Sequence, residues 1–245
     1  MKTLTSLVLL CLLCVSNAWS AEKPKVIFFD VNETLLDLNA MRTSVSDALG
    51  DRDDLMSLWF STMLHHSLVD NTTRRFHTFG EIGVASLLMV AQANDIELSE
   101  AQARKAIVTP LRSLPPHPDV KAGLKQLRKA GYRLISLTNS SNKGVQTQFE
   151  NAGMIDLFDA RYSVEDIERY KPDLRTYEWA LEKAGISADE TMLVAAHGWD
   201  IAGAKAAGWQ AAFIKRPGKV LYPLAIEPDY QVDTLTELVD KLAAQ

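Results

Sequence analysis

The stretch Phe28-Phe29-Asp30-Val31-Asn32-Glu33-Thr34-Leu35-Leu36 places one acidic residue directly after an apolar run. The run begins at Val26, and four consecutive apolar residues are typical of a strand buried on both faces of a parallel sheet. Asp30 would then lie at the carboxyl end of that strand, where open α/β sheets carry their reactive groups. The alternative is a polar strand end or a helix cap without a catalytic role.

Beyond this stretch the chain first becomes helical. In the region 41–112, apolar residues recur at helix-like spacings between Phe79 and Ala91, and Ser99 opens a second amphipathic segment that runs to Val108. The sequence Leu114-Pro115-Pro116-His117-Pro118 ends this region, because consecutive prolines can neither continue a helix nor donate to a sheet.

From residue 116 onward, predicted strands alternate with predicted helices. The strands are 132–138, 158–162, 191–196 and 211–214, and the helices are 118–130, 142–152, 172–184 and 201–207. This alternation implies right-handed crossovers and a parallel sheet that the first strand joins. We therefore predict an α/β fold, with a Rossmann-like parallel sheet core formed by residues 24–40 plus 114–245. Residues 41–113 would form an inserted all-helical cap domain.

The first twenty residues have the pattern of a cleavable signal peptide. Lys2 precedes an apolar run over residues 7–15, and small residues flank Trp19 before Ala21. The run is too short to span a bilayer, so a retained membrane anchor is the weaker alternative and no membrane association is expected after cleavage. We expect a periplasmic or secreted protein without cysteines, because Cys11 and Cys14 both lie in this segment. The net charge of −5 disfavours a nucleic-acid partner.

Further polar residues follow the predicted strands and loops. Thr138-Asn139 ends one strand, Lys171 precedes Pro172, and Asp200 follows another strand in the sequence His197-Gly198-Trp199-Asp200. Each has a simpler explanation: a helix cap, a solvated cation, or an acid favoured by a helix dipole. Their joint occurrence at the edge that also carries Asp30 favours a catalytic site.

The order Asp30, Thr138-Asn139, Lys171-Pro172 and Asp200 resembles the four motifs of the haloacid dehalogenase superfamily. Within it, Ser-Leu-Thr-Asn-Ser, Tyr-Lys-Pro-Asp-x-x-x-Tyr ending at Tyr177, and His197-Gly198-Trp199-Asp200 are most similar to the type II (S)-2-haloacid dehalogenases. The resemblance covers the chain from Lys25 onward. It implies a halogenated carboxylic acid as the substrate and a homodimer as the assembly.

The resemblance also implies roles for individual residues. The catalytic residues would be Asp30 as nucleophile, Lys171 as the cation that steadies it, and Asp200, which orients Lys171 or water. Other residues would bind the substrate by donating hydrogen bonds, supplying backbone N–H groups after Asp30 or walling the pocket, and they are Val31, Asn32, Thr34, Thr138, Asn139, Tyr177 and Trp199.

Two positions distinguish dehalogenation from phosphate-ester hydrolysis. Phosphatases of the superfamily need a second Asp as general acid where this chain has Asn32, and an amide cannot supply that proton. They also hold Mg²⁺ with an acidic pair, and the first acid is replaced here by Ala196. Halide departs from carbon without a proton, so we hypothesise that Asp30 forms an ester that water then hydrolyses. This chemistry requires neither a metal nor another cofactor.

The chain departs from the dehalogenase pattern at two other places. An Arg that cradles the leaving halide follows Leu-Trp in the family, whereas Phe60 follows Leu58-Trp59 here. We expect Phe60 and His197 to bind the substrate. His197 replaces an Asn of the family pattern, and it would either assist the activation of water or have a structural role. Cations elsewhere in the cap could replace the missing Arg, and the candidates are His65, His66, Arg74 and Arg75, although the run from Thr72 to His77 is also typical of a solvated face. The alternatives are a superfamily phosphatase and an exported binding protein on a decayed catalytic scaffold.

Overall fold

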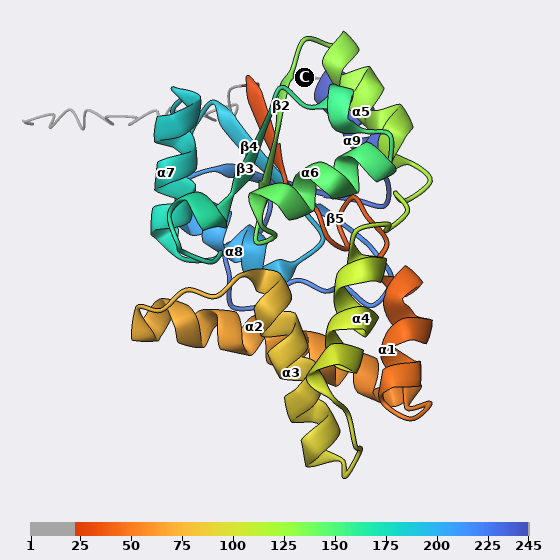
Figure 1. Ribbon diagram of the computed structural model, residues 1–245. Coiled ribbons are helices and arrows are strands. Elements are labelled where there is room, and N and C mark those ends of the chain that lie inside the picture. The colour runs from red at the N-terminus through yellow and green to blue at the C-terminus, as the bar shows by residue number, and fades with distance from the viewer. Residues whose placement is uncertain (1–22, 245) are drawn as a thin grey trace, which may run out of the picture.

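A computed structural model of the protein describes residues 23–244, and within this range six strands form one parallel sheet (Figure 1). The strand order is β3-β2-β1-β4-β5-β6, so the first strand of the chain lies between β2 and β4. The strands are β1 (Val26–Phe29), β2 (Arg133–Thr138), β3 (Ala160–Ser163), β4 (Thr191–Ala195), β5 (Gln210–Ile214) and β6 (Tyr230–Val232).

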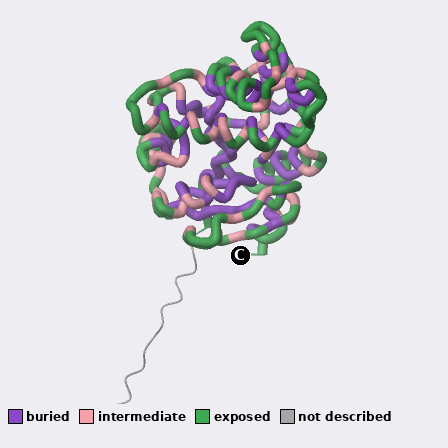
Figure 2. The backbone as a smooth tube through the Cα atoms, turned by 90° about the horizontal axis from the view of Figure 1, so that it is seen from below, coloured by how far each residue is buried: buried purple, intermediate pink, exposed green. Residues whose placement is uncertain are grey.

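Helices cover both faces of the sheet, which explains why β1 is apolar at every position. Ile27 and Phe29 belong to the cluster under α5 (Val120–Lys129), α6 (Asn142–Asn151) and α9 (Leu235–Ala243). Val26 and Phe28 belong to the opposite cluster, under α7 (Leu174–Ala184) and α8 (Gly198–Ala206). Figure 2 shows the buried chain running through the middle of the molecule and the exposed chain around it. A strand without a solvent face has no place for alternating polar residues.

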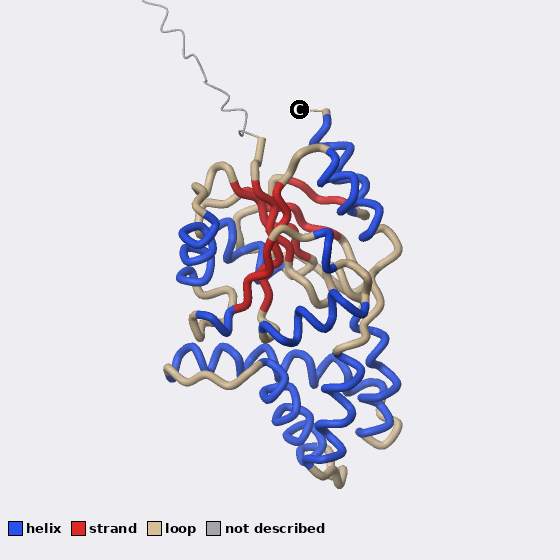
Figure 3. The backbone as a smooth tube through the Cα atoms, turned by 45° about the horizontal axis from the view of Figure 1, so that its top comes forward, coloured by secondary structure: helices blue, strands red, loops and turns tan. Residues whose placement is uncertain are grey.

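The segment between β1 and α5 is helical, and we call the part from Leu38 to Leu111 the cap. Its α-helices are α1 (Arg42–Ala48), α2 (Met56–Thr73), α3 (Phe79–Ala93) and α4 (Glu100–Leu111). Thr78 and Ser99 begin α3 and α4 with reciprocal capping boxes, which satisfy otherwise free N–H groups. Figure 3 shows these helices as a group below the sheet, beyond the ends of its strands. Trp59 of α2 binds α3, because its Nε1 donates a hydrogen bond of 2.9 Å to the Gly83 carbonyl.

The predicted fold class is confirmed, and the differences concern element boundaries and the C-terminal end. Helix α8 begins at Gly198, not at residue 201, because His197 stays extended and the helix turns immediately after it. Glycine is required there, since a Cβ atom would lie 2.7 Å from the Val220 carbonyl oxygen. Strand β6 and helix α9 were not predicted, although Thr234 and Glu237 form a recognisable helix start.

The predicted signal peptide at residues 1–20 lies outside the described residues. In the part of the chain that the structure describes, no helix is both long and apolar enough to cross a membrane.

Candidate active site

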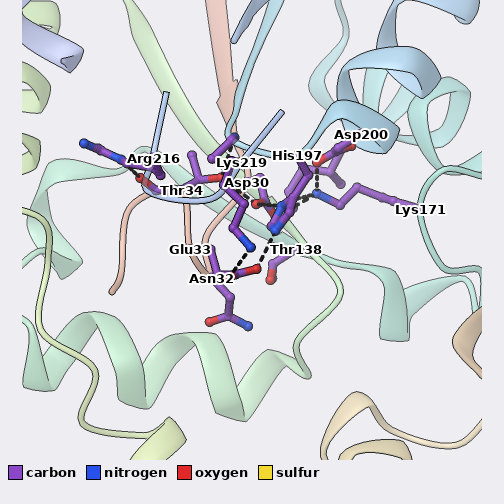
Figure 4. A network of polar contacts seen from close by, with 12 residues as sticks. Asp30, Asn32, Glu33, Thr34, Thr138, Lys171, His197, Asp200, Arg216 and Lys219 are labelled. Atoms are coloured by element: carbon purple, nitrogen blue, oxygen red, sulfur yellow. Dashed lines mark hydrogen bonds and ion pairs between the residues drawn. The ribbon is translucent and has the colours of Figure 1, made fainter. Parts of the chain in front are cut away.

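The ends of three neighbouring strands bring the predicted motifs together. Asp30 follows β1, Asn139 follows β2 and His197 lies two residues after β4, and these strands are adjacent and parallel. Lys171 reaches the same place from the loop before α7, and Asp200 from the first turn of α8 (Figure 4). Parallel strands direct all their carboxyl ends to one edge, so motifs far apart in the sequence converge there.

Asp30 is 5% exposed, and charged or hydroxyl groups hold both of its carboxylate oxygens. Lys171 Nζ lies 3.0 Å from Oδ1, while the Thr34 hydroxyl, at 2.7 Å, and His197 Nδ1, at 3.0 Å, lie against Oδ2 (Figure 4). Thr34 Oγ1 also accepts a hydrogen bond of 2.9 Å from the Ala196 amide, which ties β4 to the loop after β1. The carboxylate is therefore fixed in orientation and excluded from bulk water.

Lys171 is the centre of a buried ion-pair triad. Its ammonium lies 2.5 Å from Asp200 Oδ2 and donates to the Leu137 carbonyl at 2.8 Å, in addition to its contact with Asp30. The hydroxyl of Tyr177 donates to Asp200 Oδ1 at 2.6 Å. The predicted catalytic residues therefore meet as one network. Tyr177, predicted to wall the pocket, is fully buried in α7 and touches the network through Asp200.

The end of β2 also contributes to the site, through Thr138, its last residue, and Asn139, which follows it. Asn139 Oδ1 accepts the backbone N–H of Lys171 at 3.1 Å, while its buried Nδ2 has no hydrogen-bond partner among residues 23–244. The Thr138 hydroxyl accepts the amide of Ser140 at 3.1 Å. Thr138 therefore stabilises the turn after β2. Asn139 has a buried N–H donor that no described residue satisfies and that a ligand could use.

Asn32 points away from the triad. Its Nδ2 donates to the Ser140 hydroxyl at 3.0 Å, and its Oδ1 accepts from Gln148 of α6 at 2.9 Å. Val31, which precedes it, is fully buried among apolar side chains. An amide that both donates and accepts in this way is fixed in orientation and has no transferable proton.

His197 lies between two carboxylates. Nδ1 contacts Asp30 Oδ2, and Nε2 lies 2.7 Å from Glu33 Oε2, while Lys219 forms an ion pair with the other oxygen of Glu33 (Figure 4). The backbone of Glu33 adopts φ of +64°, a region uncommon for residues other than glycine, and this turn accompanies the placement of its carboxylate against the imidazole.

Aromatic rings complete the surroundings of His197. The Phe60 ring of α2 stacks nearly parallel to the imidazole, with centroids 6.2 Å apart and an interplanar angle of 21°. The Trp199 ring of α8 is 5.0 Å away at 23°. Trp199 Nε1 is a buried donor for which the described chain offers no acceptor. Phe60 therefore meets the core at the imidazole, and Lys219 lies 5.4 Å from its ring centroid.

The charges of this network shift the pKa values of its members. Burial raises the pKa of Asp30, but the charge of Lys171 and the hydrogen bonds from His197 and Thr34 outweigh it and hold that pKa well below its ordinary value. Burial lowers the pKa of His197, but the hydrogen bonds and charges of Asp30 and Glu33 raise it to about 9. At neutral pH, Asp30 is thus an anion and His197 a cation.

The residues around Asp30 do not fit a Mg²⁺ ion of the phosphatase type. Asn32 and Ala196 stand where two of the carboxylates would be needed, and both oxygens of Asp30 face cationic groups, Lys171 and His197. Within residues 23–244, no three His, Asp or Glu side chains are grouped so as to hold a metal ion.

Among the described residues, the side chains that contact the Asp30 carboxylate are Thr34, Lys171 and His197, and none of the cap cations named as replacements for the missing Arg is one of them. Arg74, Arg75 and His65 are exposed, and His66 Nδ1 lies 2.9 Å from the Thr62 carbonyl oxygen of its own helix. Cations that sequence reasoning missed come from the loop after β5 instead: Lys219, and Arg216, whose Nε donates to the Thr34 carbonyl at 3.1 Å. Their position after a predicted strand of the same sheet was the signal that could have identified them.

A cavity of about 270 Å³ opens between the cap and the core on the Asn32 side of the site. Ser140 and Gln148, the partners of Asn32, belong to its wall, and the cations Arg104, Arg112 and Lys143 line it as well. Glu81 lines it too, and Arg104 is paired with Glu100, so the lining of this cavity carries both signs of charge with an excess of cations.

Known proteins resemble this chain over nearly its whole length. The model of the haloacid dehalogenase-like hydrolase family matches residues 24–208. The (S)-2-haloacid dehalogenase of Pseudomonas sp. (strain YL) is 27% identical, over 88% of this chain and 93% of that one. Haloacetate dehalogenase H-2 of Moraxella sp. (strain B) is 30% identical, over 91% and 99%. The L-2-haloacid dehalogenase of Xanthobacter autotrophicus with chloropropionic acid covalently bound superposes with a TM-score of 0.84, at 22% identity, over 91% and 99%.

Proposed function

Because the chain belongs to the haloacid dehalogenase-like hydrolases, we propose that it removes halide from short (S)-2-haloalkanoic acids and produces 2-hydroxy acids. The observation that carries this proposal is the buried carboxylate of Asp30, held by Lys171, Thr34 and His197, with an amide instead of an acid at position 32. A carboxylate removed from water and fixed in direction is a strong nucleophile toward carbon. The similarity to curated dehalogenases supports the substrate class.

The reaction begins with attack of Asp30 on C2 of the substrate. A carboxylate oxygen forms a bond to C2 as the carbon–halogen bond breaks, so the product of this step is an aspartyl ester and a halide ion. Water then adds to Cγ of Asp30, and the ester bond breaks to release the 2-hydroxy acid. The halide departs without a proton, and the alkoxide of the 2-hydroxy acid takes one that comes from the attacking water, so the reaction needs no acid at the position of Asn32. No metal takes part.

Buried donors are available for the negative charges of the substrate and of the departing halide. Asn139 Nδ2 and Trp199 Nε1 are both buried and have no acceptor within residues 23–244. Lys171 contacts both residues, through its backbone N–H to Asn139 Oδ1 and with Nζ 5.7 Å from the centroid of the Trp199 ring. Preorganised N–H groups of this kind stabilise an anion without reorganisation when it forms.

The activity is tested by halide release from (S)-2-chloropropionate and from chloroacetate, with a metal chelator present. The proposal predicts release of halide at the same rate with and without the chelator. Hydrolysis of a phosphate ester that stops on chelation would instead support the phosphatase alternative. Inactivity in both assays would support a binding protein.

The covalent step is tested by one turnover in water labelled with ¹⁸O, using excess enzyme. Because water attacks Cγ of Asp30, the label should appear in the Asp30 peptide by mass spectrometry and be absent from the first hydroxy acid formed. Label found only in the product would mean that water attacks the substrate directly.

A further inference from the structure

The side chain of His197 contacts the nucleophile, and the activity proposed above leaves its proton unused. We propose that His197 is the base that activates water in the second half of the reaction, and that the charge on Asp30 decides when it can accept a proton. This inference rests on the proposed function and assigns a catalytic role to a position at which the dehalogenase pattern has Asn.

The contacts of the imidazole are those that a base acting on Cγ of Asp30 requires. Nδ1 lies 3.0 Å from Asp30 Oδ2, so a water molecule that approaches Cγ on this side is within reach of Nδ1. Nε2 lies 2.7 Å from Glu33, which fixes the ring and favours the proton on that nitrogen. The histidine side chain is 6% exposed, so the ring is held within the site and keeps a narrow contact with solvent.

The charged groups that face His197 come from every element around it. Asp30 and Glu33 follow β1 and contact the ring directly. Lys171 precedes α7 and acts through Asp30, and Lys219 follows β5 and acts through Glu33. The cap contributes the uncharged ring of Phe60, and α8 that of Trp199. Two carboxylates therefore oppose the imidazole directly, and one of them, Asp30, is the group that loses its charge on esterification.

That loss of charge changes the proton affinity of His197 during the cycle. In the free enzyme the hydrogen bonds and charges of Asp30 and Glu33 raise the pKa of His197 to about 9 against the effect of burial, so the ring is protonated. Esterification makes Asp30 neutral. Glu33 is then the one carboxylate in contact with the ring that still raises the pKa of His197, while burial still lowers it, so this pKa falls. The histidine can then release its proton to solvent, which accounts for the proton that the overall reaction produces.

The second half of the reaction, hydrolysis of the ester, then accounts for every proton. Neutral His197 takes a proton from water through Nδ1 as the oxygen of that water bonds to Cγ of Asp30. The tetrahedral intermediate collapses with cleavage of the bond between Cγ and the substrate oxygen, and the expelled alkoxide takes the proton of the new carboxylic acid. Asp30 is again an anion, His197 again a cation, and the 2-hydroxy acid is neutral at its hydroxyl.

The other polar residues of the network are less suited to this task. Asp200 has one oxygen on Lys171 and the other on Tyr177, and Lys171 is held as an ammonium by two carboxylates. Burial lowers the pKa of Lys171, but Asp200 and Asp30 raise it above its ordinary value, so this residue remains a cation. Glu33 reaches Asp30 only through the imidazole.

The test compares the two half-reactions in wild type and His197→Asn, using (S)-2-chloropropionate and rapid quenching. In the variant, halide should appear in one burst equal to the enzyme present, within about tenfold of the wild-type rate. Hydrolysis should slow by about 10²- to 10⁴-fold, the usual contribution of a general base. Mass spectrometry of the quenched protein should then find the ester on the Asp30 peptide.

Two further variants keep the outcome interpretable. Glu33→Gln should slow the same hydrolytic step to a smaller extent, because it keeps the imidazole but removes the charge that orients it. His117→Asn is the matched control. His117 Nε2 contacts the Glu33 carbonyl oxygen at 3.1 Å, so the variant removes a histidine next to Glu33 that, among the described residues, is not one of those in contact with the Asp30 carboxylate. It should accumulate no ester.

If wild type releases halide while His197→Asn slows both steps equally, or accumulates no ester, the role of His197 is wrong and the dehalogenase function stands. A wild-type protein that releases no halide overturns the dehalogenase function, and the role of His197 with it.

Discussion

The core and the cap approach Asp30 with opposite kinds of surface. On the core side, Lys171, Thr34 and His197 touch the carboxylate directly, and all three are buried. On the cap side, Phe60 stacks on His197 as an uncharged ring, and the basic pair Arg74-Arg75 is exposed. The core therefore supplies the charge around Asp30, and the cap supplies an apolar ring at His197. Charged groups that are buried in the core are fixed in their geometry around Asp30, while the cap contributes an apolar ring that shapes the site.

Removal of the nucleophilic charge should produce the largest effect of any change on either side. We expect Asp30→Asn to lower kcat for halide release by at least roughly 10⁴-fold, because an amide cannot form the ester intermediate. Steady-state halide release measures this. The control is Asp37→Asn, an N-cap carboxylate in the same loop that asparagine replaces well. Comparable turnover in the two variants would mean that Asp30 is not the nucleophile.

Breaking the buried triad should cost stability as well as activity. In Lys171→Met the carboxylates of Asp30 and Asp200 remain buried without their shared cation, so we expect the free energy of unfolding to fall by about 3–5 kcal/mol. Urea denaturation measures it. Lys241→Met removes an exposed cation 3.4 Å from Glu237 and should change the unfolding free energy by less than about 1 kcal/mol. Equal losses in the two variants would contradict the dependence of the core on the charge of Lys171.

The same comparison predicts how stability depends on pH. The folded pKa of His197, about 9, lies above its ordinary value of 6.5, so its contribution is complete below 6.5 and disappears as the pH rises through 9. We expect wild type to lose on the order of 3 kcal/mol over this interval, and His197→Asn to lose correspondingly less. Chemical denaturation at a series of pH values measures the difference.

His117 provides a control of the opposite sign. Burial and the charge of Arg216 lower its pKa, so its effect is a loss of stability as the pH falls, and His117→Asn should alter only the acid side of the profile. Unchanged alkaline behaviour in His197→Asn would show that the imidazole is not held as a cation between the two carboxylates.

The core side of the site could be predicted from the sequence to a large extent, because strand ends meet at one edge whatever the loops do. Asp30 and Asn139 were identified in this way, and Lys171 was identified by the Lys171-Pro172 sequence of the resembling family; the structure brings Lys171 into contact with both. The pairing of Glu33 with His197 could not be predicted, because it accompanies a left-handed turn at Glu33 itself. The contribution of Lys219 depends on the path of the loop after β5, which no periodic pattern determines.

The cap side was harder to predict, for a different physical reason. Helical spacing identifies which residues of α2 and α3 are buried, but not which of them meets the core after the insertion folds back. Phe60 was noticed only because it replaces an Arg of the resembling family, and its contact with His197 appears only in the structure. Tyr177 illustrates the same limit within the core, because spacing does not tell that its hydroxyl points to Asp200.

Restoring a cation on the cap side should have the smallest effect and be the most informative about the comparison. In Phe60→Arg a guanidinium would lie against an imidazole that already carries a proton, so we expect the pKa of His197 to fall by about one unit from like-charge repulsion. Phe60→Leu is the uncharged control and should leave that pKa closer to its wild-type value. Titration of the histidine ring signals by NMR measures both variants. A cation at position 60 and a protonated histidine at position 197 are then alternative ways to supply one positive charge beside the nucleophile, and an unchanged titration in Phe60→Arg would show that the two positions are independent.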